Sequence, residues 1–278
     1  MKIGGFCFHP LEAHQCASSK ASEKFCGVGW GNSRSEAVGA MFCACYGKLL
    51  QINLEIRALI RTFAGANIYM TMANKKVLYI HGFASAGSTG SATQMRNHLY
   101  TKGVQVLSPD VPVSPLQAIS FLRALVEQEQ PDLIVATSMG AMYAEQLKGV
   151  SRILVNPSFH MARLLTFRGL GRREFRNKRL DGATEFKVDK QMIQEFQEVE
   201  KGSFKGITPQ EKQLVWGLFG TQDKLVNCQA DFAKHYGKEQ MLLFEGEHFL
   251  NDKVLSKVVM PLVEESLTPG PSPRRGER

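Results

Sequence analysis

Residues 134–142 read Ile-Val-Ala-Thr-Ser-Met-Gly-Ala-Met, an apolar strand that leads through Ser138 into a helix-forming segment. A serine hydroxyl is a poor nucleophile at neutral pH unless a base takes its proton, and a sharp strand-to-helix turn can expose such a serine above the edge of a sheet. That turn needs small residues two places before and after the serine, where this chain has Ala136 and Gly140. Ala136 departs from the usual G-x-S-x-G pattern, and the stretch alone is also consistent with a serine that caps a helix beginning at Met139.

Apolar strands and helical patterns alternate on both sides of this stretch. Short buried strands that alternate with helices are typical of a parallel sheet covered by helices on both faces. We therefore predict an α/β fold whose ligands bind at the carboxyl ends of the strands. The predicted strands are 77–80, 104–107, 133–135, 153–155, 214–219 and 241–244, and the predicted helices are 92–101, 115–129, 140–147, 228–236 and 252–265.

Three chemically active side chains follow three of these strands. Ser138 follows the third strand, Asp223 the fifth and His248 the sixth. An aspartate in a turn and a histidine in a loop are ordinary when taken singly. In this order, at the ends of successive strands, they match a triad in which the aspartate orients the histidine and the histidine takes the proton of the serine.

The first predicted strand ends in a loop rich in glycine and serine, His-Gly-Phe-Ala-Ser-Ala-Gly-Ser-Thr-Gly over residues 81–90. The spacing from Gly82 to Thr89 resembles a phosphate-binding loop, but Ser88 stands where that loop needs a lysine. The alternative is an oxyanion loop, in which the backbone N–H of Phe83 points at a developing negative charge. A plain strand-to-helix connection is the third interpretation.

Together these motifs resemble the α/β-hydrolase superfamily, and the compact size and the start of the first loop resemble its small bacterial YqiA-like esterases. The resemblance covers about residues 72–267. It implies an α/β-hydrolase-type three-layer sandwich with a mostly parallel sheet, and a serine esterase that cleaves short-chain acyl esters without a cofactor. The implied site consists of the triad Ser138, Asp223 and His248 and of two oxyanion-hole donors, the backbone N–H groups of Phe83 and Met139.

The resemblance leaves other activities open. Hydrolysis of thioesters and of carbon–carbon bonds uses the same machinery. A catalytically silent binding protein is the further alternative, because a fold does not dictate a function.

A long insertion at about residues 160–212 separates the fourth and fifth predicted strands, and we expect it to form a short helical cap with a helix at 190–201. Its first part is rich in arginine. These arginines either cover apolar surface with their stems on a solvated face or receive an anionic substrate group such as a carboxylate or phosphate. The candidate substrate-binding residues are His81, His160, Arg172 and Arg173.

The composition is that of an ordinary globular protein, with 44% hydrophobic and 22% charged residues. No run reaches the roughly 18–20 apolar residues that a membrane span needs. The terminal segments carry more than half of the formal net charge of +8, so the middle of the chain does not require a polyanionic partner. We predict a cytoplasmic protein whose partner is a small acyl ester, with neither nucleic acid nor membrane as a partner.

The two ends differ from the middle. Residues 1–71 lack a regular strand–helix alternation, and we predict that they form an extension outside the folded domain 72–267. The last residues, 268–278, are rich in proline and arginine and are predicted to be a disordered tail. Five of the six cysteines lie in the first 45 residues, but without a C-x-x-C pair, so we predict no metal site.

Overall fold

The computed structural model describes residues 72–268. The predicted N-terminal extension at 1–71, all but the first residue of the predicted tail at 268–278, and the five cysteines of the first 45 residues lie outside the described residues. None of the described helices is long and apolar enough to cross a lipid bilayer.

The centre of the domain is a six-stranded sheet in which every neighbouring pair of strands is parallel. Its strand order is β2-β1-β3-β4-β7-β8. A parallel sheet of this kind is buried on both faces, which explains the continuous apolar runs in its strands. The strands are β1 (Lys76–Ile80), β2 (Gln105–Leu107), β3 (Leu133–Thr137), β4 (Ser151–Val155), β7 (Val215–Gly220) and β8 (Met241–Phe244).

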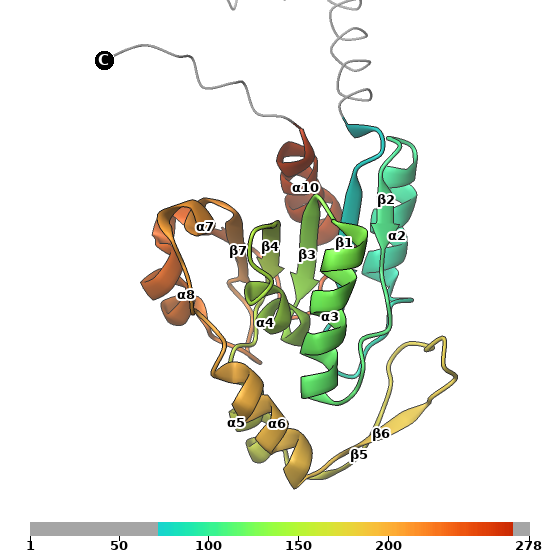
Figure 1. Ribbon diagram of the computed structural model, residues 1–278, viewed down its shortest axis with the longest axis vertical. Coiled ribbons are helices and arrows are strands. Elements are labelled where there is room, and N and C mark those ends of the chain that lie inside the picture. The colour runs from blue at the N-terminus through green and yellow to red at the C-terminus, as the bar shows by residue number, and fades with distance from the viewer. Residues whose placement is uncertain (1–71, 269–278) are drawn as a thin grey trace, which may run out of the picture. The chain divides into compact units, whose positions relative to one another are not determined.

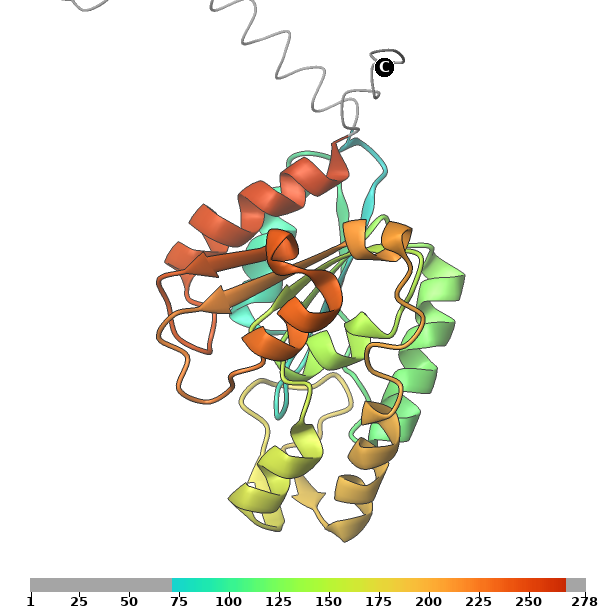
Figure 2. The same cartoon turned by 90° about the vertical axis from the view of Figure 1, so that its left-hand side faces the viewer.

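Helices cover both faces of this sheet (Figures 1 and 2). Successive strand residues point to opposite faces, so in β1 the side chains of Leu78 and Ile80 belong to the core cluster on one face, which also contains residues of α3 (Pro115–Glu129), α4 (Met139–Glu145) and α8 (Gln229–Tyr236). Val77 and Tyr79 pack on the other face with α2 (Gly90–Tyr100) and α10 (Met260–Leu267). The three layers confirm the predicted fold class.

Local sequence explains where the longer helices begin. The Thr89 hydroxyl accepts a hydrogen bond from the N–H of Ala92 and caps α2, and Ser114 caps α3 with Pro115 in its first turn. The C-terminal helix, predicted as one segment, consists of α9 (Asp252–Val254), a π-helical turn η3 (Leu255–Val259) and α10. A short 3₁₀ helix, η2 (Lys238–Gln240), precedes β8.

The segment between β4 and β7 is the insertion. It contains α5 (Met161–Arg168), β5 (Gly171–Glu174), β6 (Glu185–Val188), α6 (Lys190–Glu200) and α7 (Pro209–Gln213). The cap is predicted to be helical, and besides its helices it contains a hairpin, because β5 and β6 pair as a two-stranded antiparallel sheet. The helix predicted at 190–201 is present as α6. Most of the insertion lies beyond the carboxyl ends of the strands (Figure 1), where the candidate site residues are found.

Candidate active site

Ser138 lies on a sharp turn between β3 and α4. Its backbone has φ 53° and ψ −119°, a left-handed conformation that is rare for residues other than glycine. The turn is held because the N–H of Ser138 donates to the carbonyl oxygen of Val155 on the neighbouring strand, at 3.0 Å. The same sharp turn requires glycine at position 140, because a Cβ atom on Gly140 would lie 2.5 Å from the carbonyl oxygens of Ile80 and His81. Ala136 is fully buried in the core, so its methyl group is accommodated where the usual pattern has glycine.

The structure brings Ser138, Asp223 and His248 together from the ends of three strands. The Ser138 Oγ lies 2.9 Å from Nε2 of His248, and Nδ1 of His248 lies 2.7 Å from Oδ2 of Asp223. The side chains of His248 and Asp223 are only 7% and 5% exposed. With Nδ1–H donating to the carboxylate, Nε2 is free to accept the serine proton, which is the arrangement of a nucleophile and its base.

Backbone and amide groups hold Asp223 and His248 in place. The second carboxylate oxygen of Asp223 accepts from the N–H groups of Leu225 and Val226, at 2.8 and 3.0 Å. The buried Asn156 amide donates to the carbonyl oxygen of His248 at 2.9 Å and accepts from the N–H of Gly220 at 2.7 Å. Asn156 therefore joins the loop that carries His248 to the strand that precedes Asp223.

Two backbone N–H groups beside Ser138 are free to bind an oxyanion. Met139 is the first residue of α4, so its N–H has no acceptor within the helix. Phe83 follows Gly82, at which a Cβ atom would lie 3.2 Å from the Cβ of Ser138, so this loop runs directly beside Ser138. Within residues 72–268, neither the Phe83 nor the Met139 N–H donates a hydrogen bond. Their positions fit the predicted oxyanion-hole donors.

His81 supports this loop rather than lining the pocket of Ser138. The residue is 3% exposed, its Nδ1 lies 2.9 Å from the carbonyl oxygen of Gly82, and its Nε2 accepts from the N–H of Val111 at 3.0 Å. Burial lowers the pKa of the His81 imidazole below its ordinary value. With both nitrogens engaged in the protein, His81 has no group left for a substrate.

Gly87 and Asp110 also fix the loop that follows β1. At Gly87 a Cβ atom would lie 2.1 Å from the carbonyl oxygen of Ser108, so no other residue fits there. The carboxylate of Asp110 accepts from the N–H of Gly87 at 2.7 Å and from the N–H of Leu180 in the insertion at 2.6 Å. The loop is thus an ordered wall of the site.

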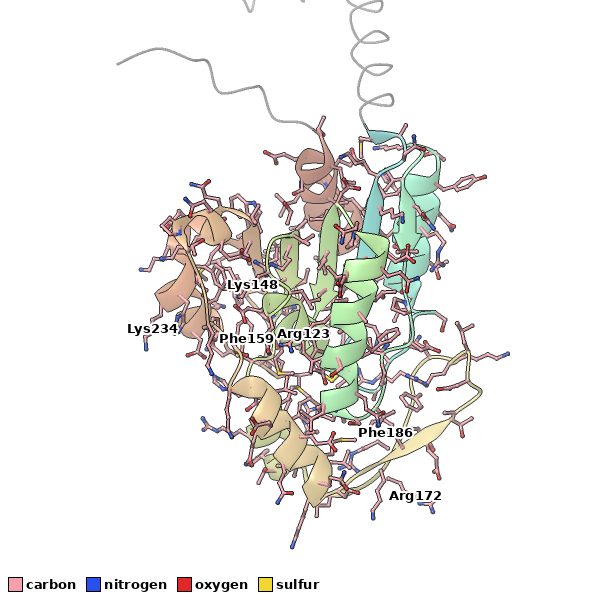
Figure 3. All side chains as sticks on the ribbon, in the orientation of Figure 1. Arg123, Lys148, Phe159, Arg172, Phe186 and Lys234 are labelled. Atoms are coloured by element: carbon pink, nitrogen blue, oxygen red, sulfur yellow. The ribbon has the colours of Figure 1, made fainter. Side chains whose placement is uncertain are left out.

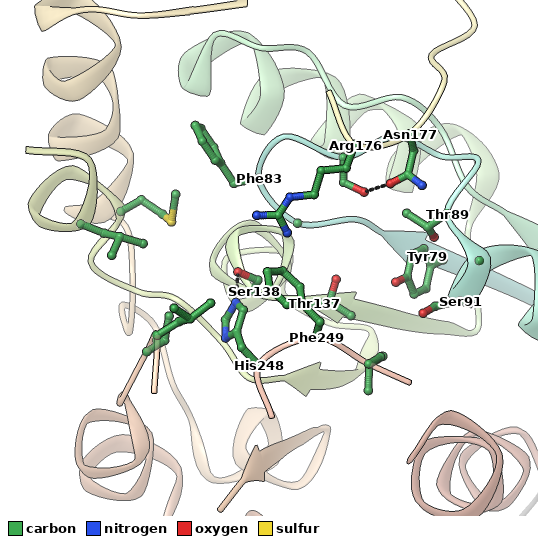
Figure 4. A pocket seen from close by; sticks show the side chains of 18 of the residues that line it. Tyr79, Phe83, Thr89, Ser91, Thr137, Ser138, Arg176, Asn177, His248 and Phe249 are labelled. Carbon is green, nitrogen blue, oxygen red and sulfur yellow. Dashed lines mark hydrogen bonds between the residues drawn. The ribbon is translucent and has the colours of Figure 1, made fainter. Parts of the chain in front are cut away.

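A pocket of about 220 Å³ opens at Ser138 and His248 (Figure 4). Its walls come from the loop after β1, the start of α2, the insertion and the loops after β7 and β8. The other lining residues are Tyr79, Gly82, Phe83, Ser85, Thr89, Gly90, Ser91, Thr137, Met161, Leu164, Arg168, Arg176, Asn177, Leu225, Val226, Phe249 and Leu250.

Three of the predicted substrate-binding residues do not line this pocket. His160 lies at the start of α5, half-exposed, with its Nε2 2.9 Å from the carboxylate of Asp231. Arg172 projects from the β5–β6 hairpin away from the sheet (Figure 3) and pairs with Glu185 across the hairpin. Arg173 donates to the carbonyl oxygens of Arg168 and Gly169. Each of these three side chains is thus engaged with a neighbouring carboxylate or carbonyl oxygen of the protein and not with the pocket.

The sequence interpretation missed other residues of the site. Arg168 and Arg176, also in the basic part of the insertion, line the pocket in place of Arg172 and Arg173. The motif Asn156-Pro-Ser-Phe-His160 contains a second functional position, because Asn156 has a positive φ of 45° and bonds the histidine loop. The signal in the sequence that could have identified Asn156 is its place directly after a predicted buried strand.

One group of side chains could offer ligands to a metal ion. The ligand atoms of His160, Cys228 and Asp231 lie within 4.8 Å of one another. Nε2 of His160 already lies within hydrogen-bond distance of the Asp231 carboxylate, and burial raises the pKa of the Cys228 thiol to about 11, which disfavours the thiolate that binds metals. None of the three side chains lines the pocket of Ser138.

Several solved structures are similar to this chain. The monoglyceride lipase of Saccharomyces cerevisiae is 17% identical with a TM-score of 0.48, and the match covers 72% of this chain and 89% of that one. Alpha/beta hydrolase domain-containing protein 10 from mouse is 13% identical with a TM-score of 0.48, over 69% and 89%. Est1E from Butyrivibrio proteoclasticus is 16% identical with a TM-score of 0.45, over 70% and 86%.

A comparison with curated protein sequences finds no match. Residues 76–259, from the first residue of β1 to the last of η3, match the uncharacterised protein family UPF0227. This span holds the whole sheet, the insertion and all the triad positions. The chain therefore belongs to family UPF0227, and its domain has the α/β-hydrolase fold.

Proposed function

We propose that this protein is a serine ester hydrolase that cleaves short-chain acyl esters through an acyl-enzyme intermediate on Ser138. The observation that carries the proposal is the hydrogen-bonded series from Ser138 through His248 to Asp223. A strained serine turn, a base within reach and an acid behind the base form the arrangement that activates a serine hydroxyl.

The mechanism follows from these contacts. Nε2 of His248 takes the proton of Ser138 as the Oγ attacks the ester carbonyl carbon, and Asp223 stabilises the resulting imidazolium. The N–H groups of Phe83 and Met139 bind the negative oxygen of the tetrahedral intermediate. The imidazolium then protonates the departing alkoxide, the carbon–oxygen bond breaks, and water repeats the sequence on the acyl-enzyme.

The pocket supports a small substrate. Its volume of about 220 Å³ is below the roughly 300–1,000 Å³ of sites that bury drug-sized ligands. The apolar side chains of Met161, Leu164 and Val226 line part of it and suit a short acyl chain.

Hydrolysis of 4-nitrophenyl esters tests the proposal. We expect the wild-type protein to hydrolyse the butyrate faster than the decanoate, and Ser138→Ala to lose the activity to the background rate. Ser120→Ala is the matched control, because the Ser120 hydroxyl donates only to the carbonyl oxygen of Leu116 in α3. Equal activity in Ser138→Ala and the wild type would reject Ser138 as the nucleophile.

The same assay separates two of the alternatives, the silent binding protein and the thioesterase. A silent binding protein would hydrolyse none of these esters although it is folded. A thioesterase would prefer S-phenyl thiobutyrate to phenyl butyrate by a large factor, whereas we expect comparable values of kcat/KM for the two substrates.

A further inference from the structure

The pocket has two chemically different sides, one on each side of Ser138. In the sheet, β3 stands between β1 and β4. The β1 side carries most of the hydroxyl groups and an amide, together with Phe83, whereas the β4 and β7 side carries four apolar side chains and Arg168. The polar set is Tyr79, Ser85, Thr89, Ser91, Thr137 and Asn177, and the apolar set is Met161, Leu164, Leu225 and Val226.

Arg176 reaches into the pocket and lies over its centre (Figure 4). Its guanidinium carbon is 4.4 Å from the centroid of the Phe249 ring. The Phe249 ring in turn lies 5.2 Å from the ring of His248, which contacts the nucleophile. The Phe249 ring therefore contacts both the guanidinium of Arg176 and the imidazole of His248.

The backbone of Arg176 is fixed although its side chain is exposed. Its N–H donates to the carbonyl oxygen of Ala84 at 2.9 Å. The next residue, Asn177, accepts from the hydroxyl of Ser85 at 2.9 Å, and the carbonyl oxygen of Lys178 accepts from the hydroxyl of Ser88 at 2.6 Å. These hydrogen bonds hold the segment 176–178 against the loop that follows β1.

The charge of the pocket is unbalanced. Arg168 and Arg176 line it, and no aspartate or glutamate does. Within residues 72–268, neither arginine forms a salt bridge. By contrast, Arg152, Arg172 and Arg179 are each paired with a carboxylate. A guanidinium without an acidic partner in a substrate pocket is suited to a carboxylate or phosphate.

We propose that Arg176, together with the hydroxyl-lined side of the pocket, binds a carboxylate or phosphate group carried by the ester substrate. The apolar side then takes the uncharged part of the ester, and Ser138 attacks the carbonyl carbon that lies between the two parts. This inference rests on the proposed ester hydrolysis and adds the class of substrate, an anionic ester. It moves the anion-binding role from Arg172 and Arg173 to an arginine that the fold places at the nucleophile.

Two pairs of esters test the proposal. In the first pair the charge is on the acyl side: 4-nitrophenyl pentanoate is compared with the 4-nitrophenyl monoester of glutaric acid. In the second pair it is on the alcohol side: phenyl acetate is compared with 4-acetoxybenzoate. We expect Arg176→Ala to lower kcat/KM at least tenfold for the charged ester of one pair and less than twofold for both neutral esters. The pair that responds tells which part of the substrate carries the charge.

Three further variants complete the experiment. Arg172→Ala is the matched control, since Arg172 is in the same hairpin but is 79% exposed and paired with Glu185. We expect Arg172→Ala to leave the ratio of kcat/KM between the charged and the neutral ester unchanged in both pairs. Arg168→Ala measures how much the second arginine of the pocket contributes to the preference for the charged ester. Arg176→Lys should retain part of the preference, because lysine keeps the charge but not the planar two-donor geometry. Equal losses on charged and neutral esters in both pairs would overturn the proposal.

Failure of the hydrolase proposal has a separate signature. In that case the wild type turns over none of the four esters. The anion site is then measured by calorimetric titration of benzylphosphonate, with benzyl alcohol as the uncharged probe. Binding of benzylphosphonate to the wild type but not to Arg176→Ala would support the site, and equal binding to both would reject it.

Discussion

The side-chain amide of Asn156 donates hydrogen bonds to two consecutive carbonyl oxygens, those of Glu247 and His248, each at 2.9 Å. Asn156 follows β4, whereas His248 follows β8, so this one side chain spans β7 and links the ends of two strands that are not neighbours in the sheet. Because the amide is buried, these bonds are shielded from water and determine where the loop of the base lies.

Replacing Asn156 should affect turnover more than substrate binding. In Asn156→Ala the loop of His248 loses both donors, and we expect kcat for 4-nitrophenyl butyrate to fall by roughly 10²-fold, the order of effect that misplacing a catalytic group by about 1 Å has, with KM changed less than threefold. Asn156→Asp should be worse, since it places a carboxylate against two carbonyl oxygens. Unchanged kcat in a folded Asn156→Ala protein would show that the bonds are unimportant for the base.

Asp223→Asn should retain the fold and lose most of the activity. In Asp223→Asn the amide oxygen keeps the hydrogen bonds from the N–H groups of Leu225 and Val226, so the amide NH2 faces Nδ1 and favours the tautomer with its proton on Nε2. In a serine protease the equivalent loss is on the order of 10⁴-fold in kcat. The measurement is kcat at pH 7 and again at high pH. Activity within tenfold of the wild type would mean that Asp223 does not orient His248.

Gly140→Ala tests the tight turn behind the nucleophile. The added Cβ atom would meet two backbone carbonyl oxygens at 2.5 Å, and overpacking of this kind costs about 1–3 kcal/mol. We expect a lower free energy of unfolding in urea and lower activity. The control is Gly90→Ala, whose Cβ atom would meet nothing within 4 Å and should leave the stability unchanged. Equal stability of the two variants would contradict the packing argument.

His81 should make stability depend on pH. Burial lowers its pKa in the folded state below the ordinary value of 6.5, so the unfolded chain binds a proton more readily than the folded one. The contribution of neutral His81 is complete above about pH 6.5 and is lost as the pH falls below it, by up to about 1.4 kcal/mol per pH unit.

Urea unfolding at pH 8, 7, 6 and 5.5 measures this effect. His81→Gln keeps an acceptor for the N–H of Val111 but does not titrate. The free energy of unfolding is compared with pH for both proteins, and the difference between the two slopes isolates His81 from the other histidines. We expect the wild type to lose more stability than His81→Gln between pH 7 and pH 5.5. Identical slopes would show that the imidazole does not carry the pH dependence.

The sheet and the triad positions could be predicted because both depend on local patterns. Each of the six predicted strands is present within a few residues, since continuous apolar runs between turns have few other structures available. The positions of Asp223 and His248 followed from strand order alone, because the carboxyl ends of parallel strands meet at one edge of the sheet.

The geometry of the insertion could not be predicted in the same way. Whether Arg172 or Arg176 faces the pocket depends on the register of β5 with β6 and on hydrogen bonds from residues 176–178 to a loop about 90 residues earlier. Both arginines look alike in the sequence. Long-range contacts of this kind leave no periodic signal, and the same holds for the link from Asn156 to the loop of His248.

Covalent labelling with a fluorophosphonate tests the central claim most directly. The reagent forms a bond to an activated serine, so we expect the intact mass of the wild-type protein to rise by one adduct and peptide mapping to place it on Ser138. Ser138→Ala should not react, and His248→Ala should react much more slowly because the base is lost. No adduct on folded wild-type protein, or an adduct on a residue other than Ser138, would contradict the account.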